Sequence, residues 1–424
     1  MHIAIIGNGV TGVAAAKRIR QLQPEWKITL ISGESDYHYS RPALMYIFMG
    51  HMSFKDTKPY QDHFWEINRI DRMRAWVTAI DHKNKKLILH KKQPLQYDKL
   101  LIATGSKSNK FGWPGQDLEG VQGLWDLMDL RNLYENVKNA KRAVIVGGGL
   151  IGIELAEMIH SRNMEVTFLV REQSYWNNVL PEEESMMINR IIRHEGLDLR
   201  LETELKEIEG DENGRVRGVI TSKGDRIDCE IVGLTAGVSP NTDLVKDSEI
   251  ETGRGILVDW SFRTNTPDIF AAGDCAELIT EGDQRNVIQQ VWYTGKMQGK
   301  VAGEVIAGKN STYNPGTWYN SAKFFDLEYQ TYGKVSNVPV QGEHNLYWEH
   351  PNHQHAMRII TRNGIVIGIN VMGLRYRHKV CERWIEENKT LDYVLDNLSE
   401  ANFDPEFYDK FEQEIRQTFK EKAA

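Results

Sequence analysis

Two glycine-rich segments carry the clearest chemical signal in the sequence. The first is Gly7-Asn8-Gly9-Val10-Thr11-Gly12, directly after the apolar run 2–6, and the second is Gly147-Gly148-Gly149-Leu150-Ile151-Gly152, after the apolar run 143–146. In this spacing the first glycine permits a tight turn, the second lets the backbone approach a pyrophosphate, and the third lets a helix pack against a strand. Amides at the start of that helix then bind phosphate. Each segment therefore predicts a dinucleotide site, with contacts from Gly7, Gly9, Val10, Thr11 and Gly12 in one and from Gly147, Gly149, Leu150, Ile151 and Gly152 in the other.

An acid about 20 residues after such a loop commonly binds a ribose hydroxyl. After the strand that follows the first loop, the nearest acid is Glu34, which is the predicted ribose ligand; a solvated turn glutamate is the alternative. After the corresponding strand of the second unit come Val170 and Arg171, with no acid at Val170. Because arginine attracts a 2′-phosphate, Arg171 slightly favours NADPH over NADH, with either nucleotide still open.

The elements that must position these loops follow a βαβ order twice. Apolar runs and helical spacing predict a strand, a helix and a strand at 2–6, 13–23 and 27–31, and again at 143–146, 150–162 and 166–170. The segment 74–90 alternates like a hairpin. Strands are expected at 346–348, 356–361 and 365–372, followed by a charged tail of helical spacing at 380–422. The pattern predicts an α/β chain with two Rossmann-type domains and a separate C-terminal region.

Composition excludes several classes of protein. The chain has 424 residues, is 41% hydrophobic and 26% charged, and has a net charge of −7. This acidic balance argues against nucleic-acid binding, and no apolar run is long enough to span a membrane. With no targeting signal recognised at the start, we expect a cytoplasmic protein. The three cysteines form no CxxC pair, which argues against a local redox disulfide or a zinc ribbon.

Three further segments, 99–106, 234–241 and 266–274, resemble sequences of the FAD- and NAD(P)-dependent pyridine nucleotide oxidoreductases, the flavoproteins with two dinucleotide-binding domains. The resemblance implies a glutathione-reductase-like fold that binds FAD in the first Rossmann domain and NAD(P)H in the second. It also implies that Asp274 binds the ribityl chain of FAD. The other cofactor contacts that it implies are Val77, Ala103, Thr104, Gly105, Ala236, Gly237 and Gly273.

Within this family, the segment 39–44 resembles the Arg-Pro-Pro-Leu segment of ferredoxin and rubredoxin reductases. The likeness places Arg41 against the pyrophosphate and Pro42 against the flavin ring. In the coenzyme A disulfide reductases and NADH peroxidases a catalytic cysteine would stand near Pro42, so its absence argues against thiol chemistry. Met45 and Tyr46 stand where the reductases have Ser-Lys, whose lysine pairs with the glutamate at the position of Glu154. This leaves open whether Glu154 pairs with another residue, such as Lys323, or remains unpaired near the nicotinamide.

The segment 290–299 is similar to the reductase helix whose start touches the pyrimidine edge of the flavin. Gln290, Val291 and Trp292 are therefore expected beside the ring, with Trp292 covering it; a core tryptophan is the alternative. Glu154 is expected to orient the nicotinamide, and Glu154 and Trp292 are the predicted catalytic residues.

The resemblance implies three domains: FAD-binding at 1–114 and 245–315, NAD(P)-binding at 115–244, and a C-terminal α+β interface domain at 316–424. It implies hydride transfer from NAD(P)H to flavin N5, then electron transfer to a small iron–sulfur or rubredoxin-type protein. The alternatives are a small-molecule acceptor (a quinone, a nitrite-linked acceptor or oxygen) and a redox sensor resembling apoptosis-inducing factor. The disulfide reductases also suggest a homodimer formed through the C-terminal domain.

Four histidines, His344, His350, His353 and His355, cluster near the C-terminal strands. Their spacing suits no standard metal site, so the sequence predicts a polar hairpin and no metal. An acid–base role for one of them is left open.

Overall fold

The structure is a computed structural model that describes residues 1–282, 285–403, 406 and 409–423. The chain forms two compact units, which are described separately. Unit 1 contains residues 1–109, 124–134 and 237–315, and unit 2 contains residues 110–123, 135–236 and 316–424.

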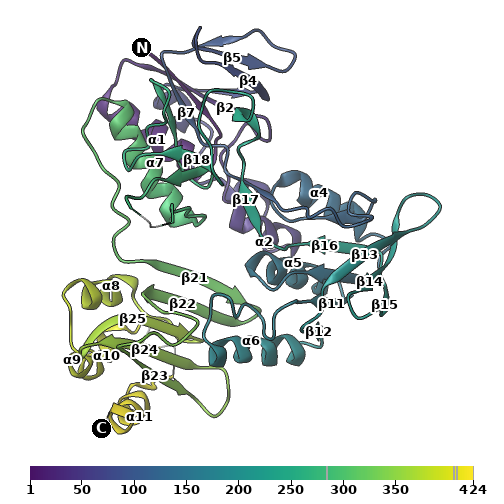
Figure 1. The fold of residues 1–424 in the computed structure, drawn as a ribbon, viewed down its shortest axis with the longest axis vertical. Helices are drawn as coiled ribbons and strands as arrows, with labels where there is room; N and C mark the ends of the chain where they lie inside the picture. The colour runs from purple at the N-terminus through teal and green to yellow at the C-terminus, as the bar shows by residue number, and fades with distance from the viewer. Residues whose placement is uncertain (283–284, 404–405, 407–408, 424) are drawn as a thin grey trace. The chain divides into compact units, whose positions relative to one another are not determined.

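Unit 1 is built on a parallel sheet (Figure 1). Its strands in spatial order are β19 (Ile269–Ala271), β7 (Lys99–Ile102), β1 (His2–Ile6), β2 (Lys27–Ser32) and β3 (Ile70–Arg74). Apart from the edge strand β3, which is largely charged and exposed, the strands are short apolar runs, as expected for a parallel sheet that is buried on both faces. Helix α1 (Val10–Leu22) leads from β1 to β2, which pair in parallel, so the unit begins with the βαβ crossover found in nucleotide-binding folds.

Helix α7 (Trp292–Ile306) packs closely on α1 because glycines line its contact face. A Cβ on Gly299 would lie 2.2 Å from the carbonyl oxygen of Thr11, and one on Gly303 would lie 2.8 Å from that of Ala15. These contacts leave no room for a side chain. They fix the start of α7 beside the glycine loop that precedes α1.

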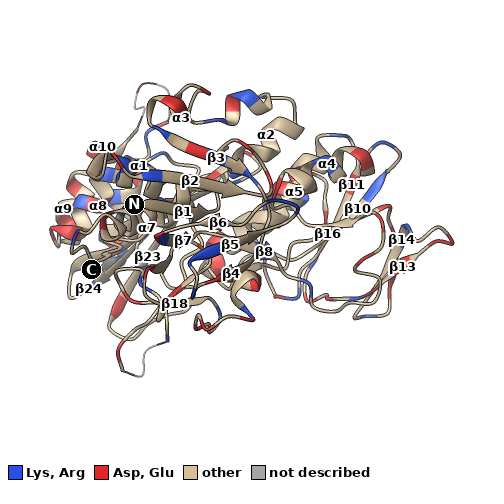
Figure 2. Cartoon of the chain, turned by 90° about the horizontal axis from the view of Figure 1, so that it is seen from above, with Lys and Arg blue, Asp and Glu red and all other residues tan. Residues whose placement is uncertain are grey.

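Smaller elements complete unit 1. They are η1 (Arg41–Ala43), α2 (Leu44–Phe48), η2 (Phe54–Thr57), α3 (Phe64–Ile67), β4 (Val77–Asp81), β5 (Lys86–Leu89), β6 (Leu95–Gln96), β8 (Ser106–Ser108), β17 (Val238–Pro240), η3 (Asp243–Val245), β18 (Ile256–Val258) and β20 (Ala276–Leu278). The β4–β5 hairpin carries basic residues (blue in Figure 2), and Lys83 and Lys85 form ion pairs with Glu249 at 2.8 Å and with Asp268 at 2.6 Å. Helix α4 (Leu127–Asn136) begins in unit 1 and ends in unit 2.

Unit 2 contains a second parallel sheet. Its strands in spatial order are β12 (Asp198–Arg200), β11 (Glu165–Leu169), β10 (Arg142–Val146), β16 (Ile231–Leu234) and β9 (Val121–Gln122). Helix α5 (Leu150–His160) follows β10, and α6 (Glu182–His194) follows β11. A small antiparallel sheet of β13 (Leu205–Gly210), β14 (Val216–Thr221) and β15 (Arg226–Asp228) is attached.

The rest of unit 2 is an antiparallel sheet with helices around it. The strands in spatial order are β21 (Tyr319–Phe324), β22 (Leu327–Gly333), β25 (Ile365–Met372), β24 (Ala356–Arg362) and β23 (Glu343–Glu349), and the helices are α8 (His378–Glu386), α9 (Leu391–Asp396), α10 (Leu398–Ala401) and α11 (Glu412–Ala423). This sheet has a hydrophobic core of its own.

A buried ion-pair network joins this sheet to α6 inside unit 2. The guanidinium of Arg358, on β24, donates from Nε and Nη2 to the two carboxylate oxygens of Glu184, both at 2.7 Å, and from Nη2 to Glu183 at 2.6 Å. The side chains of Arg358 and Glu184 are 3% and 1% exposed. The amide of Asn370 donates to Glu184 at 3.3 Å. Helix α6 and the C-terminal sheet are therefore linked by the ion pair of Arg358 and Glu184, which is buried from water.

The fold class predicted from the sequence is confirmed, and the strands at 2–6 and 365–372 have the expected bounds. The tail predicted as helical over 380–422 is divided into α8 to α11, with residues 404–405 and 407–408 outside the described part of the chain. The three-domain division with its boundaries stays a prediction. No helix among the described residues is long and apolar enough to cross a membrane.

Candidate functional site

The first glycine loop has the shape that a phosphate cradle needs. Gly7 has φ +110°, and a Cβ there would lie 2.1 Å from the carbonyl oxygen of Ala103; one on Gly12 would lie 2.0 Å from that of Gly7. At Gly9, which caps α1, a Cβ would meet nothing within 4 Å. No side chain caps this helix, which leaves its first amides available to bind the pyrophosphate of a dinucleotide.

The second glycine loop, in unit 2, repeats this arrangement. Gly147 has φ +122°, and a Cβ on it would lie 2.7 Å from the carbonyl oxygen of Thr235. Gly149 caps α5 without a side-chain hydrogen bond, and its missing Cβ again faces open space. The hydroxyl of Tyr175 donates to the carbonyl oxygen of Gly149 at 2.9 Å and closes the far side of the loop. Tyr175 was not predicted from the sequence, because its contact with the loop is not local.

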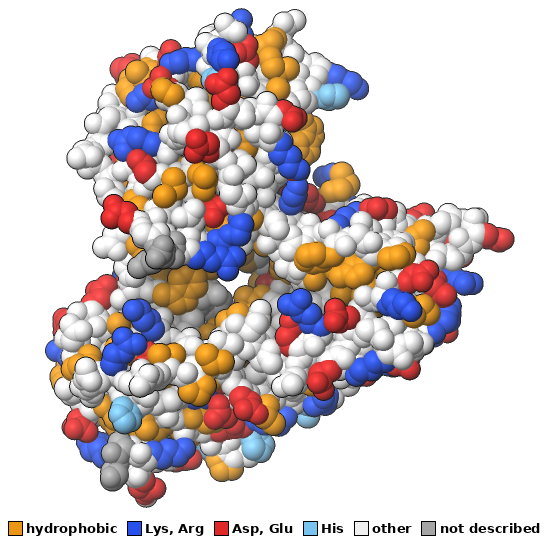
Figure 3. Space-filling model, viewed as in Figure 1, with side chains coloured by type: hydrophobic (Ala, Val, Ile, Leu, Met, Phe, Trp, Pro, Cys, Tyr) orange, Lys and Arg blue, Asp and Glu red, His pale blue; other side chains and the backbone are white. Residues whose placement is uncertain are grey.

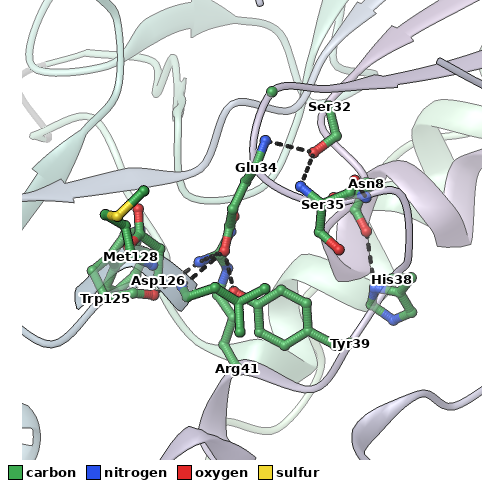
Figure 4. Close-up of polar contacts among 12 residues, drawn as sticks. Asn8, Ser32, Glu34, Ser35, His38, Tyr39, Arg41, Trp125, Asp126 and Met128 are labelled. Atoms are coloured by element: carbon green, nitrogen blue, oxygen red, sulfur yellow. Dashed lines mark hydrogen bonds and ion pairs between the residues drawn. The ribbon is translucent and has the colours of Figure 1, made fainter. Parts of the chain in front are cut away.

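Glu34 lies in a polar cluster in unit 1 (Figure 4). Its carboxylate accepts from Arg41 Nη2 at 2.5 Å, from the hydroxyl of Tyr39 and from the amide of Leu127 at 3.2 Å. Arg41 also donates to the carbonyl oxygen of Trp125 at 2.8 Å. The two residues predicted to contact the ribose and the pyrophosphate thus contact each other, so in a cofactor complex they would act as one charged pair. Their roles toward FAD stay predictions.

A series of hydrogen bonds in unit 1 links Asp274, the aspartate expected to bind the ribityl chain, to Gln290 near the start of α7. Ser106 donates to Asp274 at 3.2 Å, and the amide of Gln290 donates to the hydroxyl of Ser106 at 2.7 Å. Burial raises the pKa of Asp274, and the hydrogen bond from Ser106 opposes this shift. The sequence had suggested Asp274 and Gln290 independently; Ser106 was missed, although it follows the Ala103-Thr104-Gly105 segment directly.

The remaining residues predicted to contact a cofactor lie on several elements. Pro42 is in η1 and Val77 begins β4. Val291 caps α7, and Trp292, the first residue of that helix, is 40% exposed. Thr104 donates from its hydroxyl to the carbonyl oxygen of Asn241 at 2.7 Å. The other predicted backbone positions lie at turns with positive φ: Gly105 (+71°), Gly237 (+86°) and Gly273 (+82°). Ala236 is the last residue of the segment 135–236, which belongs to unit 2.

Glu154 lies on α5, one turn after the second loop. Burial and the neighbouring Glu157 raise its pKa to about 7. The sequence left open a pairing of Glu154 with Lys323, but the ammonium of Lys323 lies 3.3 Å from Glu157 instead. A carboxyl group in this setting can donate a hydrogen bond when protonated, for example to the amide oxygen of a nicotinamide.

Arg171 and Glu172 follow strand β11 in unit 2. Arg171 Nε donates to Glu172 at 2.7 Å, and the arginine side chain is 71% exposed. The strand registers show which residues correspond in the two sheets. The amide of Gly7 donates to the carbonyl oxygen of Ile31 in unit 1, and the amide of Gly147 donates to that of Leu169 in unit 2, so Ile31 and Leu169 correspond. Three residues further on stand Glu34 and Glu172, so Glu172 has in unit 2 the position that Glu34 has in unit 1.

The three cysteines, Cys229, Cys275 and Cys381, are free and buried. Of the four clustered histidines, His344 is on β23 and the others lie at the turn between β23 and β24 or next to it. Among the described residues, no group of three or more His, Cys, Asp or Glu side chains is arranged to hold a metal.

Residues 1–299 match the model of the pyridine nucleotide-disulphide oxidoreductase family. The chain belongs to this family. It is 29% identical over 306 residues to the biphenyl dioxygenase system ferredoxin–NAD(+) reductase component of Paraburkholderia xenovorans, which covers 72% of this chain and 74% of that protein. It is 30% identical over 278 residues to a nitrite reductase [NAD(P)H] of Bacillus subtilis, covering 65% of this chain but only 34% of that protein.

Among solved structures, the NADH:rubredoxin oxidoreductase of Clostridium acetobutylicum superimposes with a TM-score of 0.71 at 25% identity, covering 93% of this chain and 99% of that one. The protein is thus an NAD(P)H-dependent flavoprotein oxidoreductase, with FAD and NAD(P)H as the cofactors of its family. The named relatives deliver electrons to different acceptors.

Proposed function

We propose that this oxidoreductase passes electrons from a nicotinamide nucleotide through FAD to a small iron–sulfur or rubredoxin-type protein. One observation carries the proposal: two helices, α1 and α5, begin at bare glycine caps that fit two dinucleotides, while proline stands where thiol-dependent relatives need a cysteine. The chain then has the parts for accepting hydride and none for storing electrons in a disulfide at that position. The relatives named as ferredoxin and rubredoxin reductases support this choice of acceptor.

The side chains of unit 1 would hold the flavin. Bound FAD supplies a ring that accepts hydride at N5 and releases electrons singly or in pairs. The Arg41–Glu34 pair would bind the polar middle of the cofactor, and Asp274, fixed by Ser106, would bind the ribityl chain. Trp292 would cover the ring and exclude water from it. In unit 2, Glu154 would orient the nicotinamide by a hydrogen bond to its amide group.

The choice of nucleotide follows from the charges after β11. The sequence favoured NADPH because Arg171 could attract a 2′-phosphate, but the guanidinium is bound by Glu172. Since Glu172 corresponds to Glu34, its carboxylate is placed to accept from a ribose 2′-hydroxyl and to repel a 2′-phosphate. We therefore propose NADH as the preferred donor, which reverses the preference drawn from the sequence.

Rapid-mixing kinetics tests both the proposed electron acceptor and the proposed nucleotide. The FAD-loaded protein is mixed with NADH or NADPH, flavin reduction is followed by absorbance, and the reduced protein is then mixed with rubredoxin, a [2Fe–2S] ferredoxin, a quinone, nitrite with its linked acceptor, or oxygen. We expect fast transfer to one of the two proteins and slow transfer to the small molecules. Fast reduction of a quinone or oxygen alone would refute the proposed acceptor, and a long-lived charge-transfer complex with no fast acceptor would favour the redox sensor.

Two variants separate the nucleotides. Glu172→Gln should lower kcat/KM for NADH and raise it for NADPH, because the carboxylate that repels the phosphate is gone. Arg171→Ala should change the two nucleotides little if the arginine mainly neutralises Glu172. A loss confined to NADPH in Arg171→Ala would restore the sequence-based preference.

The partner surface, a homodimer through the C-terminal sheet and a cytoplasmic location stay predictions. On the face drawn in Figure 3, acidic and basic side chains are interspersed, so the proposal assigns no charge to the partner protein.

A further inference from the structure

Trp76 is a large apolar side chain that unit 1 leaves exposed. It lies between β3 and β4, and the residue is 64% exposed to solvent. Its backbone is well fixed. The amide of the preceding Ala75 donates to the carbonyl oxygen of Ser32 at 3.0 Å, and the carbonyl oxygen of Trp76 accepts from the amide of His90 at 2.9 Å. An exposed tryptophan on a fixed backbone, at the carboxyl edge of a parallel sheet, is placed to contact a ligand.

The indole lies directly against Gly33. A Cβ on Gly33 would lie 2.2, 2.4 and 2.5 Å from Cδ2, Cε2 and Cε3 of Trp76, so the central part of the ring system occupies the space of a missing side chain. The carbonyl oxygen of Gly33 accepts from Arg74 Nε at 3.0 Å, which holds the turn in place. One part of the indole is thus packed on the glycine while much of the ring remains open.

This position adjoins the predicted ribose site. Gly33 stands between Ser32, the last residue of β2, and Glu34. In a dinucleotide bound at the start of α1, the ribose lies at the carboxyl end of the second strand and the adenine lies beyond it. Purine bases stack on exposed aromatic side chains whatever their hydrogen-bonding pattern.

We propose that Trp76 is the stacking platform for the adenine of FAD, and that Gly33 is needed to let the indole lie there. The proposal depends on the FAD binding that the family implies and is independent of the electron acceptor. It deepens the assignment of unit 1 as the FAD-binding unit, because the flavin end and the adenine end would be held by separate residues.

The test measures binding to the apoprotein, without any turnover. FAD, FMN and ADP are titrated by calorimetry into wild type, Trp76→Ala, Trp76→Phe and Gly33→Ala. Trp76→Ala should weaken FAD and ADP by about 5- to 150-fold, the loss of one base–aromatic stack. FMN, which has no adenosine, should bind as it does to wild type, and Trp76→Phe should retain most of the affinity.

Gly33→Ala tests the placement of the ring without removing it. The φ of Gly33 is outside the left-handed region, so alanine can adopt the backbone, but its Cβ must displace the indole. We expect weaker FAD and ADP binding with FMN unchanged. Trp318→Ala removes another exposed indole, in unit 2, and is the matched control.

Unchanged FAD affinity in Trp76→Ala, or equal losses for FAD and FMN, would overturn the proposal, the second result indicating only a structural role. Both results leave the proposed acceptor untouched, since no acceptor is present. A wild-type apoprotein that bound no FAD would instead count against the proposed function as well.

Discussion

Replacing Arg358 with methionine should strongly destabilise unit 2. The substitution leaves the carboxylate of Glu184, which is 1% exposed, with only the amide of Asn370 at 3.3 Å as a donor from this network. Removing one partner of a buried ion pair typically costs about 3–5 kcal/mol, because the remaining charge stays buried without compensation. In a body of 150–250 residues this corresponds to roughly 10 °C in the melting temperature.

An exposed pair in the same unit gives the control. Arg383 on α8 donates to Glu400 on α10 at 2.7 Å, and both side chains are nearly half exposed. Arg383→Met should therefore cost at most about 1 kcal/mol. The double variant Arg358→Met/Glu184→Met should recover most of the loss of the single variant, because neither charge remains buried.

Scanning calorimetry of the FAD-loaded protein measures these differences, with the melting transition of unit 2 resolved from that of unit 1. Equal shifts for Arg358→Met and Arg383→Met would refute the reasoning, since burial would then have no energetic consequence. A double variant as unstable as Arg358→Met would show that packing, and not the stranded charge, dominates.

Three further outcomes are expected. The rate of flavin reduction in wild type should fall as the pH rises through the Glu154 pKa of about 7, because the protonated carboxyl that can donate a hydrogen bond to the nicotinamide is then lost. The rate should be flat in Glu154→Gln when measured from pH 5.5 to 8.5. Gly9→Ala should fold normally but bind FAD at least about tenfold more weakly in calorimetric titration. Gly12→Ala should also lower the melting temperature of the apoprotein, because of these two positions only Gly12 has a backbone atom where the new Cβ would lie. Thiol-specific alkylation of the native protein should leave activity unchanged and label no cysteine by mass spectrometry, because all three are buried; rapid labelling would contradict the burial.

The phosphate loops could be predicted from the sequence because their signals are local. Each glycine has its function within a strand, a turn and the first turn of a helix, and the structure gives Gly7 and Gly147 the positive φ that a tight turn requires. Helix α6 was missed although its start is also local: Pro181 precedes three glutamates, a pattern typical of a helix N-terminus.

The contacts that could not be predicted join segments distant in sequence. Arg41 reaches both Glu34 and the carbonyl oxygen of Trp125, which lies 84 residues further along the chain. The position of Glu172 became clear only from the strand registers, because in sequence it stands two residues after the place where the fingerprint expects an acid. A single sequence reports the residue types of these groups but not their distances.

The correspondence between the two sheets also gives a reason for the different residues that follow their second strands. Gly33 in unit 1 corresponds to Arg171 in unit 2, by the same register that equates Glu34 with Glu172. At Gly33 the missing side chain is replaced by the indole of Trp76, held by the backbone of its own hairpin. At Arg171 a flexible side chain projects into solvent and forms a surface ion pair, which contributes little binding energy.

A preorganised aromatic platform suits a cofactor that must stay bound through many turnovers, whereas an open, charge-compensated edge suits a nucleotide that must leave after each one. On this argument, grafting a glycine and an aromatic partner onto the unit 2 position would slow nucleotide release before it changed hydride transfer.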